Sequence, residues 1–381
     1  MELEQLRKEI DNIDRQLVSL FVQRMNCSAN VAEYKRENNM PVLDRARERA
    51  LLGKISELAG EEFEDYARTM YATILSLSRS YQHTRLGETT ELCGIVDEAL
   101  EKTSKLFPER ASVACQGVEG AYSQIAAERL FKAPDIMFFS NWEKVFSAIE
   151  SGMCRYGVIP IENSTAGSVK KVYDLMVSRN FKIVRTVRIK IDHCLLAKSG
   201  TQLKDIKEIF SHEQAINQCA SFLATLGPDV KITRVENTAM AAEAVARSER
   251  NDVASLSSRS CASLYGLKVL AEAIQDNGNN HTRFICITNQ LEIYPGADRT
   301  SLMLVTPHKP GALFNILARF NALGINLLKL ESRPIPDKDF EFMFYFDLES
   351  PIYSPKLSQL LAELEKECDE FTYLGSYSEV I

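Results

Sequence analysis

Residues 1–36 read MELEQLRKEIDNIDRQLVSLFVQRMNCSANVAEYKR, a stretch with a regular apolar pattern. Apolar side chains recur in it every three or four residues, at Leu3, Leu6, Ile10, Ile13, Leu17 and Leu20. An α-helix returns to the same face at this spacing, so the pattern predicts a helix with one continuous apolar stripe. Neither Pro nor Gly occurs before Pro41, and the helix should therefore extend to about Arg36.

Two further helices are predicted after this one. The first of them begins near Leu43, after Pro41, and ends at Gly53 or Gly60. The second covers residues 61–84. Together the three helices predict an all-helical domain over residues 1–90. One of them is too long to bury its stripe within such a bundle, and we expect a second chain to pair with it.

Two cations lie where the stripe of the first helix should be apolar. Arg24 occupies the position after Leu20, and Lys35 lies 11 residues further on, within about 20° of the same face. Burying an unpaired guanidinium is costly. Arg24 therefore either extends to water at the end of the stripe or has an anionic partner.

Polar side chains also recur one turn apart on the other two helices. Asp44, Arg47 and Glu48 share one face, a pattern that also fits a solvated ladder of ion pairs. Ser78 and Gln82 share a face as well, which also fits surface residues or hydrogen bonds in the core.

Taken together, these residues predict a cationic cavity inside a helix bundle. Arg7 lies 17 residues before Arg24, about 100° away around the helix, so it would reach the cavity from a partner chain. The cavity suits a small molecule with several negative charges. It contains no nucleophile–base pair and no set of metal ligands, and chemistry there would rely on conformational restraint and electrostatics.

The pattern changes after a polar segment at residues 86–110 that suits a linker. Short apolar strands and amphipathic helices then alternate up to about residue 288, which predicts an α/β domain with largely parallel sheets. Its length suits two lobes with a cleft between them. The predicted strands are 112–115, 156–161, 183–187, 194–197, 209–210, 253–256 and 284–287. The predicted helices include 123–131, 142–151, 214–226 and 239–248.

The last part of the chain has a different order of elements. The pattern predicts strand, helix, strand, strand, helix, strand, the ferredoxin-like βαββαβ arrangement of about 80 residues. The predicted elements are 301–306, 312–323, 326–332, 340–348, 355–366 and 371–376.

Length and composition exclude several classes of protein. The 381 residues are enough for two or three domains, and 45 basic against 52 acidic residues give a net charge of −7. With a pI of about 5.5, nothing in the charge favours nucleic acid. No apolar run approaches the roughly 18 residues of a membrane span, and the charged start is not a secretory signal. Nine cysteines without a CxxC pair indicate reduced thiols in the cytoplasm and neither disulfides nor a zinc site.

Four segments of the α/β part combine glycines or polar residues with element ends: 117–123, 159–169, 211–214 and 280–284. The glycines of the first fit an anion site at a helix N-terminus, or a simple turn. The polar cluster of the second fits a ligand at a strand end, or the cap of the next helix. No GxGxxG motif opens a βαβ unit, which argues against a nicotinamide enzyme.

The helical part resembles the all-helical chorismate mutase family through LRKEID, the spacing from Arg24 to Lys35, and PVLDRARER. The resemblance implies a Claisen rearrangement of chorismate to prephenate in an intertwined dimer. Arginines would hold the two carboxylates, while the lysine and a carboxyl or amide side chain would contact the ether oxygen. The implied chorismate-binding residues are Arg7, Arg24, Lys35, Asp44, Arg47, Glu48, Ser78 and Gln82, with Lys35 and Glu48 as catalytic residues.

Residues 111–288 resemble prephenate dehydratase through GVEGAYS, VIPIENSTAGSV, DHCLL, FSHEQ and HTRF, in this order. The resemblance implies a two-lobed fold of periplasmic-binding-protein type, and removal of carbon dioxide and the ring hydroxyl to give phenylpyruvate. Thr282 would be the catalytic donor to the leaving hydroxide. The implied prephenate-binding residues are Ser123, Asn163, Ser164, Thr165, Ser211, Gln218, Thr282 and Arg283. Arg283 either holds a carboxylate or pairs with Glu162, and His193 and His212 are either proton carriers or structural histidines.

The last domain resembles the phenylalanine-binding ACT domain through PGAL at 310–313 and LESRP at 330–334. The alternative is a helix N-terminus and an edge strand closed by Pro, without a ligand. The resemblance implies L-phenylalanine as an allosteric inhibitor, bound between chains. Its implied site residues are Gly311, Ala312, Leu313, Asn326, Glu331, Ser332, Arg333 and Pro334.

The three resemblances, in this order, predict the bifunctional chorismate mutase–prephenate dehydratase family. The expected domains are 1–90, a linker at 91–108, 109–289 and 298–381. We expect chorismate and prephenate as substrates, a homodimer or higher homo-oligomer, a cytoplasmic location, no cofactor or metal, and no nucleic acid or membrane partner. Two alternatives are a dehydratase whose helical domain only dimerises, and a non-catalytic sensor of aromatic metabolites.

Overall fold

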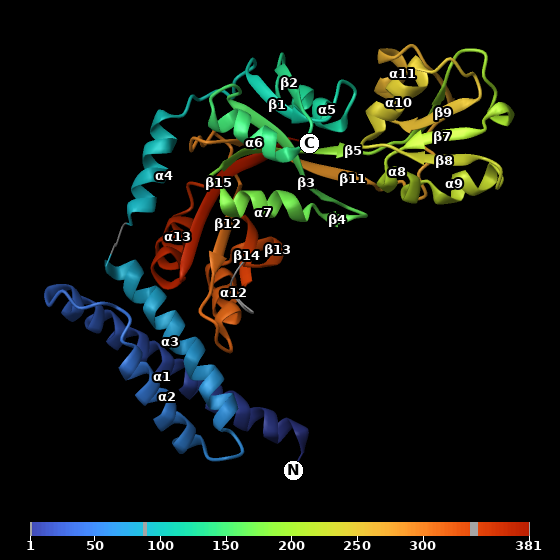
Figure 1. The fold of residues 1–381 in the computed structure, drawn as a ribbon. Helices are drawn as coiled ribbons and strands as arrows, with labels where there is room; N and C mark the ends of the chain where they lie inside the picture. Colours follow the sequence, from blue (N-terminus) through green and yellow to red (C-terminus); the bar gives the residue numbers. More distant parts are fainter. Residues whose placement is uncertain (1, 87–89, 336–341, 381) are drawn as a thin grey trace. The chain divides into compact units, whose positions relative to one another are not determined.

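The computed structural model describes residues 2–86, 90–335 and 342–380, which divide into two compact units. The first unit contains Met1–Glu98 and Leu302–Thr372, and the second contains Ala99–Ser301 and Tyr373–Ile381. Figure 1 follows the chain through both units from blue to red. Each unit is therefore built from two stretches that lie far apart in the sequence.

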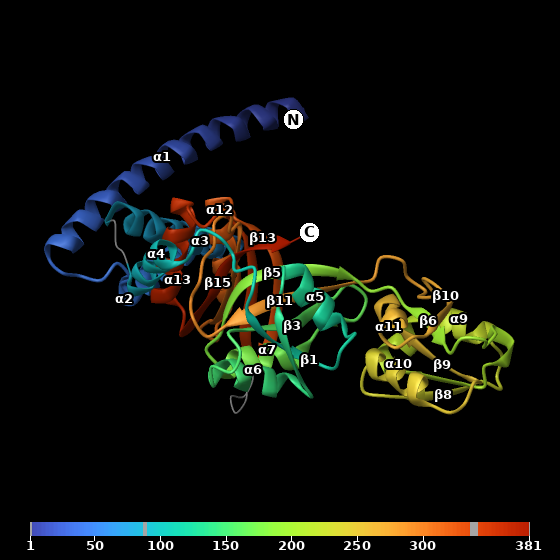
Figure 2. The same ribbon diagram turned by 90° about the horizontal axis from the view of Figure 1, so that it is seen from above.

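The first unit begins with the predicted helices α1 (Leu3–Glu37), α2 (Arg45–Ala59) and α3 (Glu64–Leu86). Both α1 and α2 pack against α3. The N-terminal half of α1 extends away from α2 and α3 (Figure 2), and its apolar stripe is exposed, with Ile10 56% and Leu20 61% accessible. The stripe is therefore uncovered within one chain, and its covering by a second chain stays a prediction.

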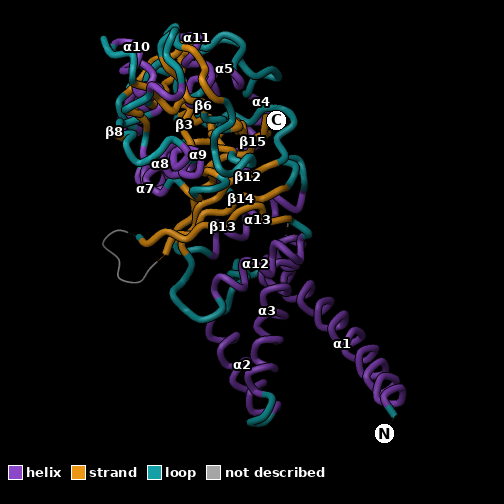
Figure 3. Tube along the Cα trace, turned by 90° about the vertical axis from the view of Figure 1, so that its right-hand side faces the viewer, coloured by secondary structure: helices purple, strands orange, loops and turns teal. Residues whose placement is uncertain are grey.

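The rest of the first unit has the predicted order of strands and helices, with the strands arranged β13-β14-β12-β15. Helices α12 and α13 both pack against α3. In Figure 3 these strands are orange and the mutually packed helices purple. The first residues of the strand predicted at 340–348 lie outside the described residues. The elements are β12 (Arg299–Val305), α12 (Ala312–Leu323), β13 (Asn326–Pro334), β14 (Phe342–Glu349), α13 (Pro355–Glu367) and β15 (Glu370–Val380). Strands β12 and β15 each have residues in both units.

The segment predicted to be a linker contains a helix, α4 (Glu91–Lys102), and the boundary between the two units falls within it, between Glu98 and Ala99. Its apolar residues Val96 and Ala99 are buried. Their three-residue spacing is the helical signal that the polar composition of the segment obscured.

The second unit contains two lobes. The first lobe's sheet has the order β15-β5-β11-β3-β1-β2, and helix α5 packs on β1, β3 and β5. Its core includes Tyr156, Val158 and Val187. The elements of this lobe are β1 (Ser112–Gln116), α5 (Tyr122–Leu130), β2 (Asp135–Phe139), α6 (Trp142–Glu150), β3 (Tyr156–Asn163), β4 (Gly167–Ser168), α7 (Lys170–Ser178), β5 (Lys182–Lys190) and β11 (His281–Thr288).

The second lobe has its own sheet, of order β10-β6-β9-β7-β8, and its own cores. The chain passes between the lobes twice, from β5 to β6 and from β10 back to β11. Its elements are β6 (Cys194–Ala197), β7 (Glu208–Ser211), α8 (Glu213–Gln218), α9 (Ala220–Thr225), β8 (Lys231–Arg234), α10 (Thr238–Arg247), β9 (Val253–Ser257), α11 (Arg259–Leu264) and β10 (Lys268–Ala271).

Both sheets of the second unit are mixed, so the expectation of largely parallel sheets is wrong. Strand β11 pairs antiparallel with both β3 and β5, and β6 pairs antiparallel with β9 and β10. The reason is the two crossings between lobes, which return the chain in the opposite direction through each sheet. No helix in the described ranges is long and apolar enough to cross a membrane.

Candidate active sites

The first unit brings together Arg24 of α1 and Ser78 of α3, two of the residues predicted to bind chorismate. Arg24 donates through Nη1 to Ser78 Oγ at 2.6 Å, and Ser78 is only 4% exposed. Lys35, further along α1, donates through Nζ to the carbonyl oxygen of Val42 at 2.6 Å. Arg24 therefore has a partner inside the bundle and does not simply extend to water.

Gln82, one turn after Ser78, is buried and its Oε1 has no hydrogen-bond partner among the residues that the structure describes. Buried acceptors are nearly always satisfied in proteins, so an orphan one indicates a missing donor. Because Gln82 follows Ser78 on the same helix face, its unsatisfied oxygen marks a second polar group on the face that carries the partner of Arg24.

The residues on α2 have two different roles. Asp44 caps the helix, because its Oδ1 accepts a hydrogen bond from the Arg47 backbone N–H at 2.9 Å. Glu48 pairs instead with Arg79 of α3, Nη1 to Oε1 at 2.5 Å, which argues against the alternative of a solvated ion-pair ladder among Asp44, Arg47 and Glu48. Arg47 is exposed, as is Arg7 of α1. The sequence analysis did not single out Arg79. This residue follows Ser78 directly in sequence and therefore lies about 100° around the helix from the face that carries Ser78 and Gln82.

In the second unit, Asn163 and Thr282 lie opposite each other where β3 ends and β11 begins. Asn163 Nδ2 donates to Thr282 Oγ1 at 2.9 Å. The Asn163 Oδ1 accepts from the Thr165 and Ala166 backbone N–H groups and from Thr165 Oγ1. The amide of Asn163 therefore fixes both the strand end and the threonine hydroxyl.

Asn280 joins this cluster to the second lobe. It is 1% exposed, its Oδ1 accepts from Asn163 Nδ2 at 2.8 Å, and its Nδ2 donates to Gln218 Oε1 at 3.0 Å. Gln218, at the end of α8, in turn donates to Thr165 Oγ1 at 3.2 Å. Sequence reasoning had not assigned a role to Asn280, although its segment was singled out. The signal is a polar residue next to the point where the chain re-enters the first lobe.

His193 lies between β5 and β6, where the chain first passes from one lobe to the other, and it contacts Gln218 of the same hydrogen-bond network. Its Nε2 lies 3.0 Å from Gln218 Oε1, and burial lowers its pKa despite the opposing effects of Gln218 and Asp192. The ring is therefore neutral at pH 7, with the proton on Nε2, since Gln218 Oε1 is an acceptor. His212 instead caps α8, its Nδ1 accepting from the Gln214 N–H at 3.3 Å, and burial lowers its pKa also.

Other residues predicted to bind prephenate are satisfied by the chain itself. Ser123 donates to the Gln116 carbonyl at 2.7 Å, Ser211 donates to that of Leu256 at 3.0 Å, and Ser164 donates to that of Asn279 at 2.9 Å. Arg283 lies opposite Glu162 in the sheet, and the two form an ion pair of 2.7 Å. The structure thus joins Asn163, Thr165, Gln218 and Thr282 in one network, without Ser123 or Ser211.

The glycine-rich segment before α5 is a turn held by packing. Gly120 has φ +88°, and a Cβ there would lie 2.8 Å from Cys261 Sγ. Its backbone N–H donates to Gln124 Oε1 at 2.7 Å. Since this N–H already has a partner, the segment fits a simple turn better than an anion site at the helix N-terminus. Nearby, a cavity of about 540 Å³ is lined by residues of both lobes, including Gln116 and His212.

In the C-terminal part of the first unit, Gly311, Ala312 and Leu313 line a cavity of about 270 Å³ together with Phe342 and Phe344. The neighbouring strand carries Glu331, Ser332, Arg333 and Pro334. Asn326 is at the opposite end of that strand, where its Nδ2 donates to Glu349 Oε2 at 2.8 Å. Within one chain, the structure therefore separates Asn326 from the other predicted residues.

No group of three or more His, Cys, Asp or Glu side chains suited to a metal ion occurs within residues 2–86, 90–335 and 342–380. The cysteines described are all free thiols.

Comparison with known proteins matches both parts of the chain. The chorismate mutase type II family model matches residues 6–83, and the prephenate dehydratase model matches residues 113–292. The bifunctional chorismate mutase/prephenate dehydratase of Escherichia coli K12 is 31% identical, over 98% of this chain and 95% of that protein. The chloroplastic arogenate dehydratase/prephenate dehydratase 2 of Arabidopsis thaliana is 37% identical, over 70% of this chain and 73% of that protein.

The chain is also similar to a solved structure. The prephenate dehydratase of Arthrobacter aurescens, in complex with L-Phe, has a TM-score of 0.64 and 28% identity, over 70% of this chain and 90% of that one. The two family models match separate stretches of the chain. The similarity to the bifunctional Escherichia coli relative extends over both stretches and over nearly the whole length of that protein. The chain therefore has chorismate mutase and prephenate dehydratase activities, and it belongs to the bifunctional chorismate mutase/prephenate dehydratase family.

Proposed function

We propose that Arg24, Lys35, Arg47, Glu48, Ser78 and Gln82 surround chorismate, with Arg7 of the partner subunit completing the site. The observation that supports this arrangement is the hydrogen bond from half-buried Arg24 to buried Ser78, one turn before the unsatisfied Gln82. A Claisen rearrangement needs no proton transfer or nucleophile, so the site acts by holding the substrate in its reactive conformation. Cations bind its two carboxylates, and the Lys35 ammonium and the Gln82 amide stabilise charge that develops on the ether oxygen.

In this proposal Asp44 acts through the backbone. Its carboxylate caps α2 and thereby fixes the first turn, which carries Arg47 and Glu48. The carboxylate charge itself has no further role at the site. This differs from direct contact with chorismate, the role that the family resemblance implied.

For the second reaction we propose Thr282 as the donor to the leaving hydroxyl of prephenate. Its Oγ1 accepts a hydrogen bond from Asn163, and among the described residues it donates to no acceptor. The hydroxyl proton is therefore available to the substrate. A threonine is a weak acid. The reaction relies on placement and on the aromatisation that accompanies loss of carbon dioxide and hydroxide.

The cluster that positions Thr282 includes residues from both lobes, since Gln218 of the second lobe bonds Asn280 and Thr165 of the first. These contacts between the lobes, and the cavity that residues of both lobes line, support a prephenate site in the cleft. In this arrangement Arg283 is a structural partner of Glu162. Ser123 and Ser211 support the surrounding backbone.

We further propose that the C-terminal domain is a phenylalanine-binding ACT domain that inhibits the dehydratase. The cavity at Gly311, Ala312 and Leu313 has an apolar side formed by Phe342 and Phe344, which suits an aromatic side chain. The Arthrobacter relative supports the choice of ligand because its structure contains L-Phe. Asn326 joins the site only if a second chain supplies it.

One experiment tests these assignments together. The purified full-length protein is incubated with chorismate at neutral pH, and prephenate and phenylpyruvate are followed over time, with and without L-phenylalanine. We expect phenylpyruvate to accumulate and L-phenylalanine to suppress it. Unchanged phenylpyruvate production at millimolar L-phenylalanine would refute the ACT assignment. The residue assignments are tested by the variants described below.

A further inference from the structure

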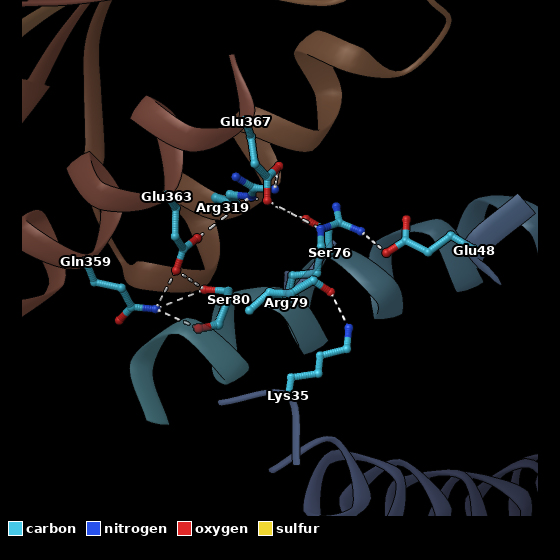
Figure 4. Close-up of polar contacts among 10 residues, drawn as sticks. Lys35, Glu48, Ser76, Arg79, Ser80, Arg319, Gln359, Glu363 and Glu367 are labelled. Carbon is cyan, nitrogen blue, oxygen red and sulfur yellow. Dashed lines mark hydrogen bonds and ion pairs between the residues drawn. The ribbon is translucent and has the colours of Figure 1, made fainter. Parts of the chain in front are cut away.

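Helix α3 presents polar residues to two different neighbours. Ser78 and Gln82 belong to the face that meets Arg24 of α1. Ser76, Arg79 and Ser80 contact residues of α12 and α13 in the C-terminal domain. Figure 4 shows this second set of contacts, which involves a part of the chain about 240 to 290 residues away in sequence.

The second face contains buried charged groups that pair with one another and with hydroxyls of α3. Arg319 of α12 is 3% exposed, donates to Ser76 Oγ at 3.3 Å and forms an ion pair with Glu367 of α13. Glu363 is 1% exposed and accepts from Ser80 Oγ at 2.7 Å. A buried charge that loses its partner is strongly destabilising. These pairings therefore specify one arrangement of α3 against α12 and α13.

Arg79 connects this interface to the proposed chorismate site. Its Nη1 lies 2.5 Å from Glu48 Oε1, and its Nε lies 3.3 Å from Glu367 Oε1. Its side chain is only 11% exposed. The signs alternate from Glu48 through Arg79 and Glu367 to Arg319 (Figure 4). The shared arginine joins a carboxylate of α2 to a carboxylate of α13.

The ion pair of Arg79 and Glu48 affects how the site binds chorismate. Chorismate carries two carboxylates, so an uncompensated carboxylate at position 48 would repel it. A cation held against Glu48 removes that repulsion and restricts the side chain to one orientation. Arg79 can do both because its guanidinium donates to two carboxylates at once.

We propose that Arg79 is a positioning residue of the mutase, which orients and neutralises Glu48 and is itself held by Glu367 of the C-terminal domain. The inference rests on the proposed role of Glu48. It means that the mutase site depends on a residue of α13, and that the C-terminal domain contributes to the first reaction without contacting chorismate.

The test measures kcat and KM for chorismate in the full-length chain. In Arg79→Ala we expect KM to rise about tenfold with kcat within about threefold, since repulsion by bare Glu48 acts on substrate and transition state alike. Arg79→Lys should recover most of this loss, because an ammonium still neutralises Glu48. Glu367→Ala should raise KM by a smaller factor. Arg79, Glu48 and Glu367 line a cavity of about 480 Å³, and the exposed Arg49 lines it too. The matched control is therefore Arg49→Ala, which should leave KM unchanged.

A double variant separates this inference from the proposed site. If Arg79 acts by neutralising Glu48, then Arg79→Ala should have no effect on KM in a Glu48→Gln background. Equal KM increases in both backgrounds would overturn the inference. Loss of kcat in Arg79→Ala with KM unchanged, and no recovery in Arg79→Lys, would indicate a purely structural role and also overturn it. If Glu48→Gln alone leaves kcat and KM at the wild-type values, the proposed role of Glu48 fails instead.

Discussion

The Thr282 hydroxyl has one hydrogen-bond partner, Asn163, among the residues that the structure describes. Asn163 donates a hydrogen bond to the oxygen of the Thr282 hydroxyl, and the hydroxyl proton therefore stays available for the substrate. Removing the hydroxyl while keeping the side-chain shape, in Thr282→Val, should lower kcat for prephenate by about 100-fold or more. Thr282→Ser, which retains the hydroxyl, should stay within about tenfold of wild type.

The measurement is phenylpyruvate formation from supplied prephenate, with chorismate consumption as the internal control. Mutase activity should be the same in both variants. A Thr282→Val protein that makes phenylpyruvate at the wild-type rate would show that another group protonates the leaving hydroxyl.

His193 gives the dehydratase unit a defined response to pH. Its folded-state pKa lies below the ordinary value, because burial outweighs the hydrogen bond to Gln218 and the charge of Asp192. As the pH falls below about 6.5, the unfolded chain takes up a proton that the folded chain refuses, so stability decreases on acidification. The contribution is fully present above this pH.

His193→Gln removes the titration and keeps a donor toward Gln218. We expect the thermal midpoint of the wild type to fall more than that of the variant between about pH 7.5 and pH 5.5. His212, whose pKa is also lowered, is present in both proteins and cancels in the comparison. Identical pH dependence in the two proteins would mean that His193 titrates at its ordinary pKa.

At the scale of elements, Asp44 at the start of α2 has two possible roles, as the cap of the helix and as a contact to chorismate. Asp44 caps the helix that carries Glu48, and Asn caps as well as Asp does. We therefore expect Asp44→Asn to keep mutase kcat/KM within about threefold and stability unchanged. Asp44→Ala should cost about 1 kcal/mol of helix stability.

Chorismate turnover and thermal unfolding of the two variants distinguish the cap from a substrate contact. If Asp44→Asn loses activity while its unfolding midpoint is that of the wild type, the carboxylate charge contacts the substrate. The direct role implied by the family resemblance would then be correct.

The helices and strands with a strong period were predictable from the sequence. The stripe from Leu3 to Leu20 gave α1 nearly to its last residue, and the buried run 194–197 gave β6 with both of its ends. Strand β2 was missed because its residues are only partly buried and lack a clear alternation. The helix predicted at 214–226 is interrupted at Cys219, where the backbone leaves helical geometry.

The polar cluster at Asn163 was predictable because a local motif places it at a strand end, whereas the role of Thr282 follows only from the family resemblance and stays a prediction. Arg79 and Asn280 were not predictable, because their roles arise from partners distant in sequence. Asn280 meets Asn163 across 117 positions, and Arg79 meets Glu367 across 288. No periodic pattern within a helix or strand carries that information. The strand register and the packing of α3 create it only in the folded chain.

At the scale of the whole molecule, the exposed stripe on α1 and the position of Arg7 both predict a shared mutase site. Five stripe residues, Leu3, Ile10, Ile13, Leu17 and Leu20, are each at least 50% exposed. Arg7 is also exposed and lies about 100° around the helix from Arg24. If α1 pairs with its copy in a two-fold dimer, Arg7 of the partner subunit enters the site that contains Arg24, and each dimer has two such sites.

Subunit complementation tests this arrangement directly. Arg7→Ala and Arg24→Ala homodimers should each lose mutase activity and retain dehydration of supplied prephenate. In a heterodimer of the two variants, one site has both substitutions and the other has neither. Random co-assembly from equal co-expression should therefore restore about one quarter of wild-type mutase activity, since about half the dimers are mixed and half their sites are intact. If each chain builds its site alone, the mixture stays inactive at every ratio, and the exposed stripe on α1 must serve another purpose.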